Sequence, residues 1–184
     1  MRVSYTSPFT GVTTTSWMSL EELTYKKEVA EIENEKFEME KRRVEQTYPP
    51  TALNSLSGTE SFTNSATNHI FKGVVNKQGL ATGYHYEGIE PTGGRVIPGT
   101  KTLPDKYGVY KAKVSVNGII KTNRSTFFPR DWTPQQVVNA INEAYANRSF
   151  VTGSFNEYSG RTSNGMSITM YLNKNGKIVS AFPE

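Results

Sequence analysis

The sequence predicts an α+β fold in which antiparallel β-sheets pack with one helix, preceded by a long N-terminal helix. Three observations predict this class. Apolar and polar residues alternate along 110–116 and along 166–172, as in strands with one buried face. Asn117-Gly118 supplies the residues that a tight turn between antiparallel strands favours. Residues 134–145 instead have the apolar spacing of an amphipathic helix.

Length and composition limit the alternatives. The chain has 184 residues, enough for one domain of about 100–150 residues and an appendage. Hydrophobic residues make up 35% of the chain, so most of it can bury a core. It has no cysteine, which excludes disulfides, thiolate metal ligands and a cysteine nucleophile. No apolar run approaches the roughly 18 residues of a membrane helix, and the N-terminus lacks the pattern of a secretory signal, so no membrane segment is expected.

Charge divides the chain into parts. Residues 1–50 carry seven Lys/Arg and nine Asp/Glu, a net charge of −2, whereas residues 51–184 carry fourteen and eight, a net charge of +6. We expect an N-terminal segment with a charged helical arm over 1–50, a linker over 51–68 and the main domain over 69–184. A basic body favours polyanionic partners such as nucleic acid, anionic lipid or an acidic protein. A basic surface without any partner remains equally compatible with the charge.

The predicted arm begins at a capping box formed by Ser19 and Glu22 and continues without Gly or Pro to about Gln46. Pro49-Pro50 ends it, and the Ser/Thr/Asn-rich stretch that follows suits a linker. The apolar positions that recur every seven residues are Leu23, Ala30, Phe37 and Val44. This stripe is narrow, so the arm is expected to be solvated or packed against a partner.

Short strands are expected from residue 69 onward. Residues 69–76 and 81–87 are predicted to pair around the turn 77–79, and the Gly/Pro-rich stretch 88–105 is predicted to be a loop. The strand 110–116 turns at Asn117-Gly118 and returns toward Phe127-Phe128.

The helix after these strands has a clear start. Thr133 and Gln136 can form a capping box, with Pro134 at the first helical position. The side chains expected on its buried face are Val137, Val138, Ile141, Ala144 and Tyr145. Two strands, 166–172 and 177–182, then follow around an Asn/Gly turn, which completes the antiparallel arrangement.

Two residues stand out for acid–base chemistry. Histidine alone has an ordinary pKa that lets it take and give a proton near neutral pH, and the chain contains only His69 and His85. Both fall within the predicted hairpin, so they are expected to lie close together. Two alternatives stay open: each histidine supports a strand without reacting, or the pair binds a metal with Glu87 or Glu90.

Lys121 is the strongest candidate for binding a phosphate. It follows the predicted hairpin turn, and the donor-rich stretch 122–126 comes directly after it. An exposed basic turn is the alternative reading. Nucleotide-binding glycine motifs and the G-x-S-x-G motif of serine hydrolases do not occur in the sequence.

Together these residues resemble the bacterial EndoU-type endoribonucleases, including the C-terminal nuclease domains of LXG-type polymorphic toxins. The resemblance covers about residues 68–183. The matching blocks, in order, are His69-Ile-Phe-Lys-Gly73, Gly83-Tyr-His85, the stretch from Tyr110 to Gly118, Ser125-Thr-Phe-Phe-Pro129 leading into Trp132-Thr-Pro, and Ile178-Val-Ser-Ala-Phe-Pro183.

The resemblance implies roles for six residues. His69, His85 and Lys121 match the catalytic residues of the family. Ser125, Ser180 and Phe182 match its substrate-binding positions, which line the nucleoside pocket. Many members have tyrosine where this chain has Phe182, which can stack on a base but cannot donate a hydrogen bond.

The implied activity is that of a metal-independent endoribonuclease toxin. It would cleave RNA at uridines by attack of the 2′-hydroxyl and leave a 2′,3′-cyclic phosphate, with His85 as base, His69 as acid and Lys121 stabilising charge. No cofactor is required, although manganese stimulates some members. The resemblance also implies an acidic immunity protein, and a secreted effector that acts in the cytoplasm of a target cell. A non-catalytic RNA- or protein-binding module and a metal-dependent nuclease are the competing classes.

Overall fold

The computed structural model describes residues 2–6, 13–17, 52–89 and 92–184, together with scattered positions between Thr24 and Met39. The chain forms two compact units, Met1–Arg43 and Val44–Glu184. In the first unit, β1 (Arg2–Thr6) pairs antiparallel with β2 (Thr13–Trp17), a hairpin that the sequence analysis did not predict.

The predicted N-terminal helix lies largely outside the described residues. The described positions between Thr24 and Met39 are helical. The capping box at Ser19 and Glu22, and all four positions of the heptad stripe, belong to the residues that the structure does not describe. The arm therefore stays a prediction.

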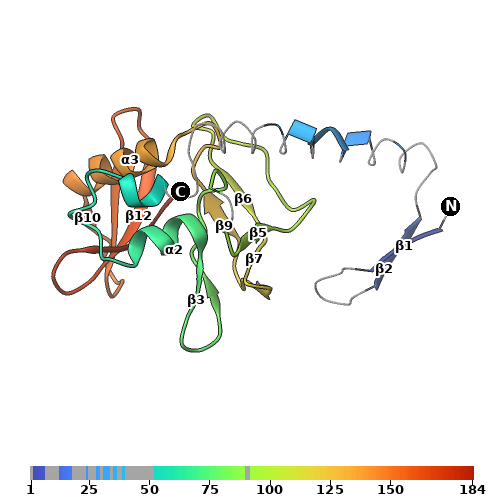
Figure 1. Cartoon of the computed structure of the whole chain (residues 1–184), viewed down its shortest axis with the longest axis horizontal. Coiled ribbons are helices and arrows are strands. Elements are labelled where there is room, and N and C mark those ends of the chain that lie inside the picture. Colours follow the sequence, from blue (N-terminus) through green and yellow to red (C-terminus); the bar gives the residue numbers. More distant parts are fainter. Residues whose placement is uncertain are drawn as a thin grey trace. The chain divides into compact units, whose positions relative to one another are not determined.

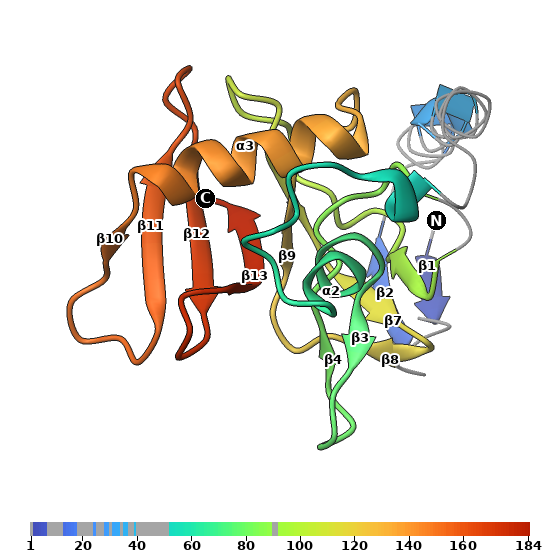
Figure 2. The ribbon, with the colours of Figure 1, turned by 60° about the vertical axis from the view of Figure 1, so that its left-hand side comes forward.

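A four-stranded antiparallel sheet forms one side of the Val44–Glu184 unit. Its strands are β10 (Ser149–Phe150), β11 (Glu157–Arg161), β12 (Ser167–Leu172) and β13 (Ile178–Pro183), in that order. The helix α3 (Pro134–Ala146) lies across β11 and β12 (Figure 2). Alternation along β12 explains this packing, because Ile168 and Met170 are fully buried.

The start of α3 agrees with the prediction. The Thr133 side chain accepts a hydrogen bond from the Gln136 backbone, and the Gln136 side chain accepts one from the Thr133 backbone. Pro134 occupies the first turn, where no intrahelical donor is needed. The buried residues of the helix are Pro134, Val137, Val138, Ala140, Ile141 and Ala144, whereas Tyr145 is half-buried.

Three smaller antiparallel sheets lie beside the four-stranded sheet within this unit (Figure 1). Their strands are β3 (Val74–Val75) with β4 (Ala81–Thr82); β5 (Gly94–Val96), β7 (Val114–Val116) and β8 (Ile119–Ile120); and β6 (Tyr110–Ala112) with β9 (Ser125–Phe127). Asn117 and Gly118 have φ values of 49° and 81°, so the predicted tight turn between β7 and β8 is confirmed. The predicted α+β class, with antiparallel sheets and a packed helix, is also confirmed.

Three predictions for this region are corrected. The predicted loop 88–105 contains the strand β5, and the predicted strand 110–116 is divided into β6 and β7, which belong to different sheets. The predicted strand 69–76 is wrong in its first half. Residues Ala66–Lys72 form the helix α2, so His69 is helical rather than part of a hairpin. The physical reason is a helical spacing of apolar residues: Ala66, Ile70 and Phe71 share the buried face. The helix ends at Gly73, which has a φ of 73°. The hairpin itself survives in shorter form, as the two-residue strands β3 and β4.

The stretch expected to be a linker contributes to the core of the unit. Residues Ala52–Ser55 form a short 3-10 helix, labelled η1. Phe62 is buried and forms a parallel bridge with Ile178 at the edge of β13. Ser57 and Gln135 exchange backbone and side-chain hydrogen bonds, which fixes the stretch to α3. The Ser/Thr-rich composition of this stretch concealed these anchors.

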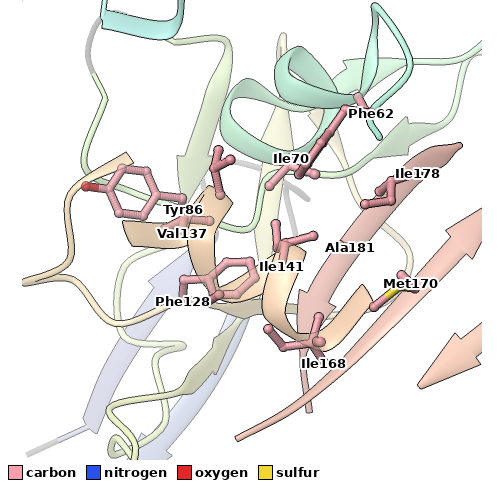
Figure 3. Close-up of a cluster of buried hydrophobic side chains, with 14 of the residues drawn as sticks. Phe62, Ile70, Tyr86, Phe128, Val137, Ile141, Ile168, Met170, Ile178 and Ala181 are labelled. Carbon is pink, nitrogen blue, oxygen red and sulfur yellow. The ribbon is translucent and has the colours of Figure 1, made fainter. Parts of the chain in front are cut away.

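The Val44–Glu184 unit has two hydrophobic cores, and His85 lies in the segment that connects them. The larger core lies between α2, α3 and the four-stranded sheet, as Figure 3 shows for Ile70, Ile141 and Ile168 among others. The smaller core lies among the small sheets. Tyr84 belongs to the smaller core and Tyr86 to the larger one, so the residues on either side of His85 are anchored in different cores. No helix in the described parts of the chain has the length and hydropathy of a membrane span.

Candidate active site

The structure brings together three residues that the sequence analysis singled out. His69 comes from α2 and His85 from the irregular segment after β4, and their ring centroids are 6.5 Å apart. Lys121 follows β8, and its Nζ donates hydrogen bonds to the Gly83 carbonyl at 3.0 Å and to Ser125 Oγ at 2.9 Å. Two imidazoles and an ammonium group therefore surround the turn at Gly83.

Backbone contacts explain why these elements meet. The Tyr84 N–H donates to the His69 carbonyl at 2.9 Å, and the His85 N–H donates to the Ile70 carbonyl at 2.7 Å. Gly83 lies so close to α2 that a Cβ there would be 2.1 Å from the His69 carbonyl oxygen. Its φ of 75° also favours glycine. The Gly-x-His spacing therefore follows from close packing against α2.

His85 is held in one orientation by two contacts. Its Nδ1 lies 2.8 Å from the Thr126 carbonyl oxygen. A carbonyl can only accept, so this contact assigns the proton to Nδ1 and leaves Nε2 with a free lone pair. The ring also stacks on Phe182, with centroids 5.0 Å apart and an interplanar angle of 22°. At 4% exposure, His85 is a buried neutral imidazole whose Nε2 can accept a proton.

Burial and charge set the protonation of the site. Burial lowers the pKa of His69 to about 4, with a smaller contribution from the positive charge of Lys121. The pKa of His85 is also well below 6.5, chiefly through burial and then through Lys121, although the Thr126 carbonyl opposes this shift. Burial lowers the pKa of Lys121 to about 8. At neutral pH the free site therefore contains two neutral imidazoles and a largely protonated lysine.

Two of the three expected substrate-binding residues, Ser125 and Phe182, contact this group, and Ser180 lies on the same strand as Phe182. Ser125 is fully buried, and its Oγ donates to the Gly83 carbonyl at 3.0 Å while accepting from Lys121. Its single proton is thereby engaged, so it can offer a ligand only a lone pair. Ser180 and Phe182 are two residues apart on β13, and both face the side of the sheet away from α3.

Three site features were missed by the sequence analysis. The Thr126 carbonyl is a backbone group, so no side-chain pattern could reveal it. Tyr84 has a left-handed φ of 63°, for which the preceding glycine was the only signal. Tyr171 lies on the same sheet face as Phe182, with ring centroids 6.1 Å apart. The alternation along β12 could have placed Tyr171 on that face.

The carboxylate considered for a metal site is engaged elsewhere. Glu87 is buried, accepts a hydrogen bond from the Tyr110 hydroxyl at 2.5 Å and forms an ion pair with Lys101 at 2.9 Å. The other candidate, Glu90, lies outside the described residues. Within the described ranges, no group of three or more His, Cys, Asp or Glu side chains is arranged to hold a metal ion.

Comparison with known proteins assigns the chain to a family. The family of bacterial EndoU nucleases matches residues 63–184. The chain belongs to this family, which confirms the resemblance inferred from the five sequence blocks. The match begins before His69, within the stretch expected to be a linker.

One curated relative adds a more particular similarity. The chain is 50% identical over 134 residues to a protein named "Toxin" from Bacillus cereus. The aligned region covers 71% of this chain but 24% of the relative, so the chain spans about a quarter of the length of the relative. No solved structure matches the chain.

Proposed function

We propose that the chain is a toxin domain that cleaves RNA by transphosphorylation, without a metal ion, at uridines. The observation that carries this proposal is the convergence of His69, His85 and Lys121 at the Gly83 turn. Membership of a nuclease family and the similarity to a protein named Toxin support it. RNA contains its own nucleophile, the 2′-hydroxyl, so two proton-transfer groups and one cation suffice.

His85 is the base in this mechanism. Its free Nε2 removes the proton from the 2′-hydroxyl, because Nδ1 is bonded to the Thr126 carbonyl. The 2′-oxygen then attacks the adjacent phosphorus, and the bond from phosphorus to the 5′-oxygen breaks. His69 gives a proton to the departing 5′-oxygen. The products are a 2′,3′-cyclic phosphate and a 5′-hydroxyl, which conserves every proton that was transferred.

Lys121 stabilises the charge of the pentacoordinate phosphorane. Two of its three ammonium protons are directed to Gly83 and Ser125, which leaves one for a non-bridging phosphate oxygen. The two protein bonds fix the ammonium group before substrate binds, and such preorganisation is the basis of electrostatic catalysis.

Substrate binding supplies the acid form of His69. In the free site, its pKa of about 4 leaves it neutral at pH 7. A phosphodiester bound beside it introduces a negative charge that offsets Lys121 and favours the imidazolium. The proposal therefore includes a rise in the pKa of His69 when the substrate binds.

Recognition of the nucleoside is assigned to the β13 side of the site. Phe182 offers an aromatic surface for stacking, and Ser180 offers a hydroxyl that can both donate to and accept from a uracil edge. Phe182 lacks a hydroxyl, so hydrogen bonding to the base falls to Ser180 and to the lone pair of Ser125. We therefore propose a preference for uridine that depends on Ser180.

The test is cleavage of a labelled RNA containing one uridine, in EDTA, by the wild type and by His69→Ala, His85→Ala and Lys121→Ala. We expect cleavage by the wild type alone. A variant that cuts as fast as the wild type removes that residue from the mechanism. RNA binding without cleavage by the wild type would favour a binding module, and activity that is abolished by EDTA and extends to DNA would favour a metal-dependent nuclease.

The cellular context is also part of the proposal. A toxic nuclease must be inhibited in the cell that makes it, which requires an immunity protein, and the net charge of +6 over residues 51–184 predicts that this partner is acidic. By analogy with toxins, the domain would be exported and act on RNA in the cytoplasm of a target cell. Co-purification of an acidic partner that abolishes cleavage tests this assignment.

A further inference from the structure

Tyr84 has a backbone conformation that an aromatic residue rarely adopts. Its φ is 63°, and among the described residues the only other non-glycine with a positive φ is Asn117. Asn117 lies in a tight hairpin turn, where asparagine is favoured. Tyr84 lies in no such turn, and bulky residues at positive φ are strained. Strain of this kind persists only where the surrounding structure enforces it.

The packing around the Tyr84 side chain enforces this conformation. The residue is 3% exposed, and its ring meets Phe127 edge-on with centroids 5.3 Å apart. Two glycines lie against Tyr84. A Cβ added at Gly94 would be 2.4 Å from the Tyr84 ring, and a Cβ added at Gly73 would be 3.0 Å from the Tyr84 Cβ. Gly73 and Gly94 therefore leave space that the Tyr84 side chain fills.

The strained residue controls one peptide group at the centre of the site. The group joining Gly83 to Tyr84 is bonded on both sides: its N–H donates to the His69 carbonyl, and its C=O accepts from Lys121 and Ser125. Rotation of this group would break the contact with α2 and the contact with the lysine together. The φ of Tyr84 sets its orientation.

We propose that Tyr84 is a positioning residue, whose packed ring holds a left-handed backbone that directs the Gly83–Tyr84 peptide group between His69 and Lys121. Tyr84 touches neither substrate nor reacting atoms in this role. The expected effect of Tyr84 on catalysis rests on the proposed function. The expected effect of Tyr84 on the placement of Lys121 is independent of that function.

The test separates backbone conformation from side-chain packing. Asparagine adopts positive φ readily but packs poorly in an apolar core, whereas leucine packs well but is strained at positive φ. A residue that only fills space would make Tyr84→Leu the better variant. A positioning residue makes Tyr84→Asn the better variant for catalysis, and Tyr84→Phe, which keeps the ring, serves as the conservative control.

The test has two measurements. The first is kcat per folded molecule on a uridine-containing RNA, and the second is the pKa of Lys121, determined by NMR without substrate. For Tyr84→Phe we expect a kcat within about threefold of the wild type. For Tyr84→Leu we expect a loss of about 10²-fold, the effect of a displacement near 1 Å at a reacting centre. Tyr84→Asn should retain about tenfold more activity than Tyr84→Leu. The pKa of Lys121 should stay near 8 in the wild type and in Tyr84→Asn, and rise toward 10.5 in Tyr84→Leu.

Equal or higher kcat in Tyr84→Leu than in Tyr84→Asn, with the same Lys121 pKa in both, would overturn the inference. If either variant fails to fold, Tyr84→Gly and Tyr84→Ala replace them, because both lack the ring and only glycine tolerates positive φ. Glycine should then be the more active of the pair, and the reverse order would reject the inference. A wild type that cleaves no RNA would reject the proposed function, while the lysine titration would still decide the role of Tyr84.

Discussion

The rings of His69 and His85 lie with centroids 6.5 Å apart, although one residue is helical and the other is in an irregular segment. Two consecutive backbone hydrogen bonds from residues 84 and 85 to α2 create this relationship. Main-chain hydrogen bonds thus fix the position of the His85 backbone relative to that of His69. This rigidity is what proton transfer to and from a single phosphodiester requires.

Replacing either histidine should abolish most of the activity. His85→Ala removes the proposed base and His69→Ala removes the proposed acid, and each proton transfer contributes about 10²–10⁴-fold to the rate. Single-turnover cleavage of a uridine-containing RNA measures the effect. Thr126→Ala is the matched control, because it keeps the carbonyl that bonds to His85, so its activity should remain close to that of the wild type.

Lys121→Met should raise the pKa of both histidines. The positive charge of Lys121 contributes to lowering each pKa, second only to burial. Removing that charge should move the pKa of His69 up from about 4 but leave it below 6.5, because burial persists. NMR titration of the imidazole C–H signals measures this shift. An unchanged or lower value would show that the ammonium group does not act on the histidines.

Activity should fall in mildly alkaline solution. Lysine is charged below its pKa, so the cation that Lys121 is proposed to supply is lost as the pH rises through about 8, rather than through its ordinary value of 10.5. The descending limb of kcat/KM against pH should therefore lie near 8. Lys121→Arg should extend this limb to higher pH if it remains active, because arginine stays protonated.

The folded state should lose stability in acid through His69. Between pH 6.5 and about 4 the unfolded chain binds a proton that the buried imidazole does not, so stability rises with pH across this window. The difference between the two pKa values corresponds to roughly 3 kcal/mol at the acid end. His69→Gln should reduce this dependence without abolishing it, because the pKa of buried His85 is also lowered and acts in the same direction. Urea unfolding at pH 4.5 and 7.5 measures the change. A variant as acid-sensitive as the wild type would contradict this assignment.

Gly83→Ala should be far more damaging than Gly79→Ala. Both glycines have a positive φ, so each variant loses the conformational freedom of glycine, at a cost of about 1 kcal/mol. Only at position 83 would the new methyl group meet the backbone of α2, 2.1 Å from the His69 carbonyl, whereas nothing lies within 4 Å of the equivalent point at position 79. Thermal unfolding of the two variants compares these effects.

The sequence predicted the elements whose signals are local. The alternation along β12, the Asn117-Gly118 turn and the Thr133 capping box each depend on neighbouring residues, and all three are present. The helix at His69 was not predicted because it is only seven residues long, and the apolar pattern of so short a segment is equally compatible with a strand. The buried position of Phe62 depends on a contact with Ile178, which is too distant in sequence for any local pattern to show.

The candidate site was predictable from its side chains but not from its geometry. The chain has only two histidines, and Lys121 lies among hydrogen-bond donors, so the residue types alone indicate all three side chains. The groups that orient them are backbone atoms, namely the carbonyls of Gly83 and Thr126. Main-chain atoms are common to all residues, so only the folded structure could identify them.

The chemistry of the cleaved ends tests the central claim most directly. The substrate is a DNA oligonucleotide with a single ribouridine, incubated with the wild-type chain in EDTA and examined by mass spectrometry. The proposed action of His69, His85 and Lys121 on one phosphodiester predicts a 2′,3′-cyclic phosphate and a 5′-hydroxyl, with no cleavage of the all-deoxy oligonucleotide. A 3′-hydroxyl paired with a 5′-phosphate, or cleavage that does not need the ribose hydroxyl, would contradict it.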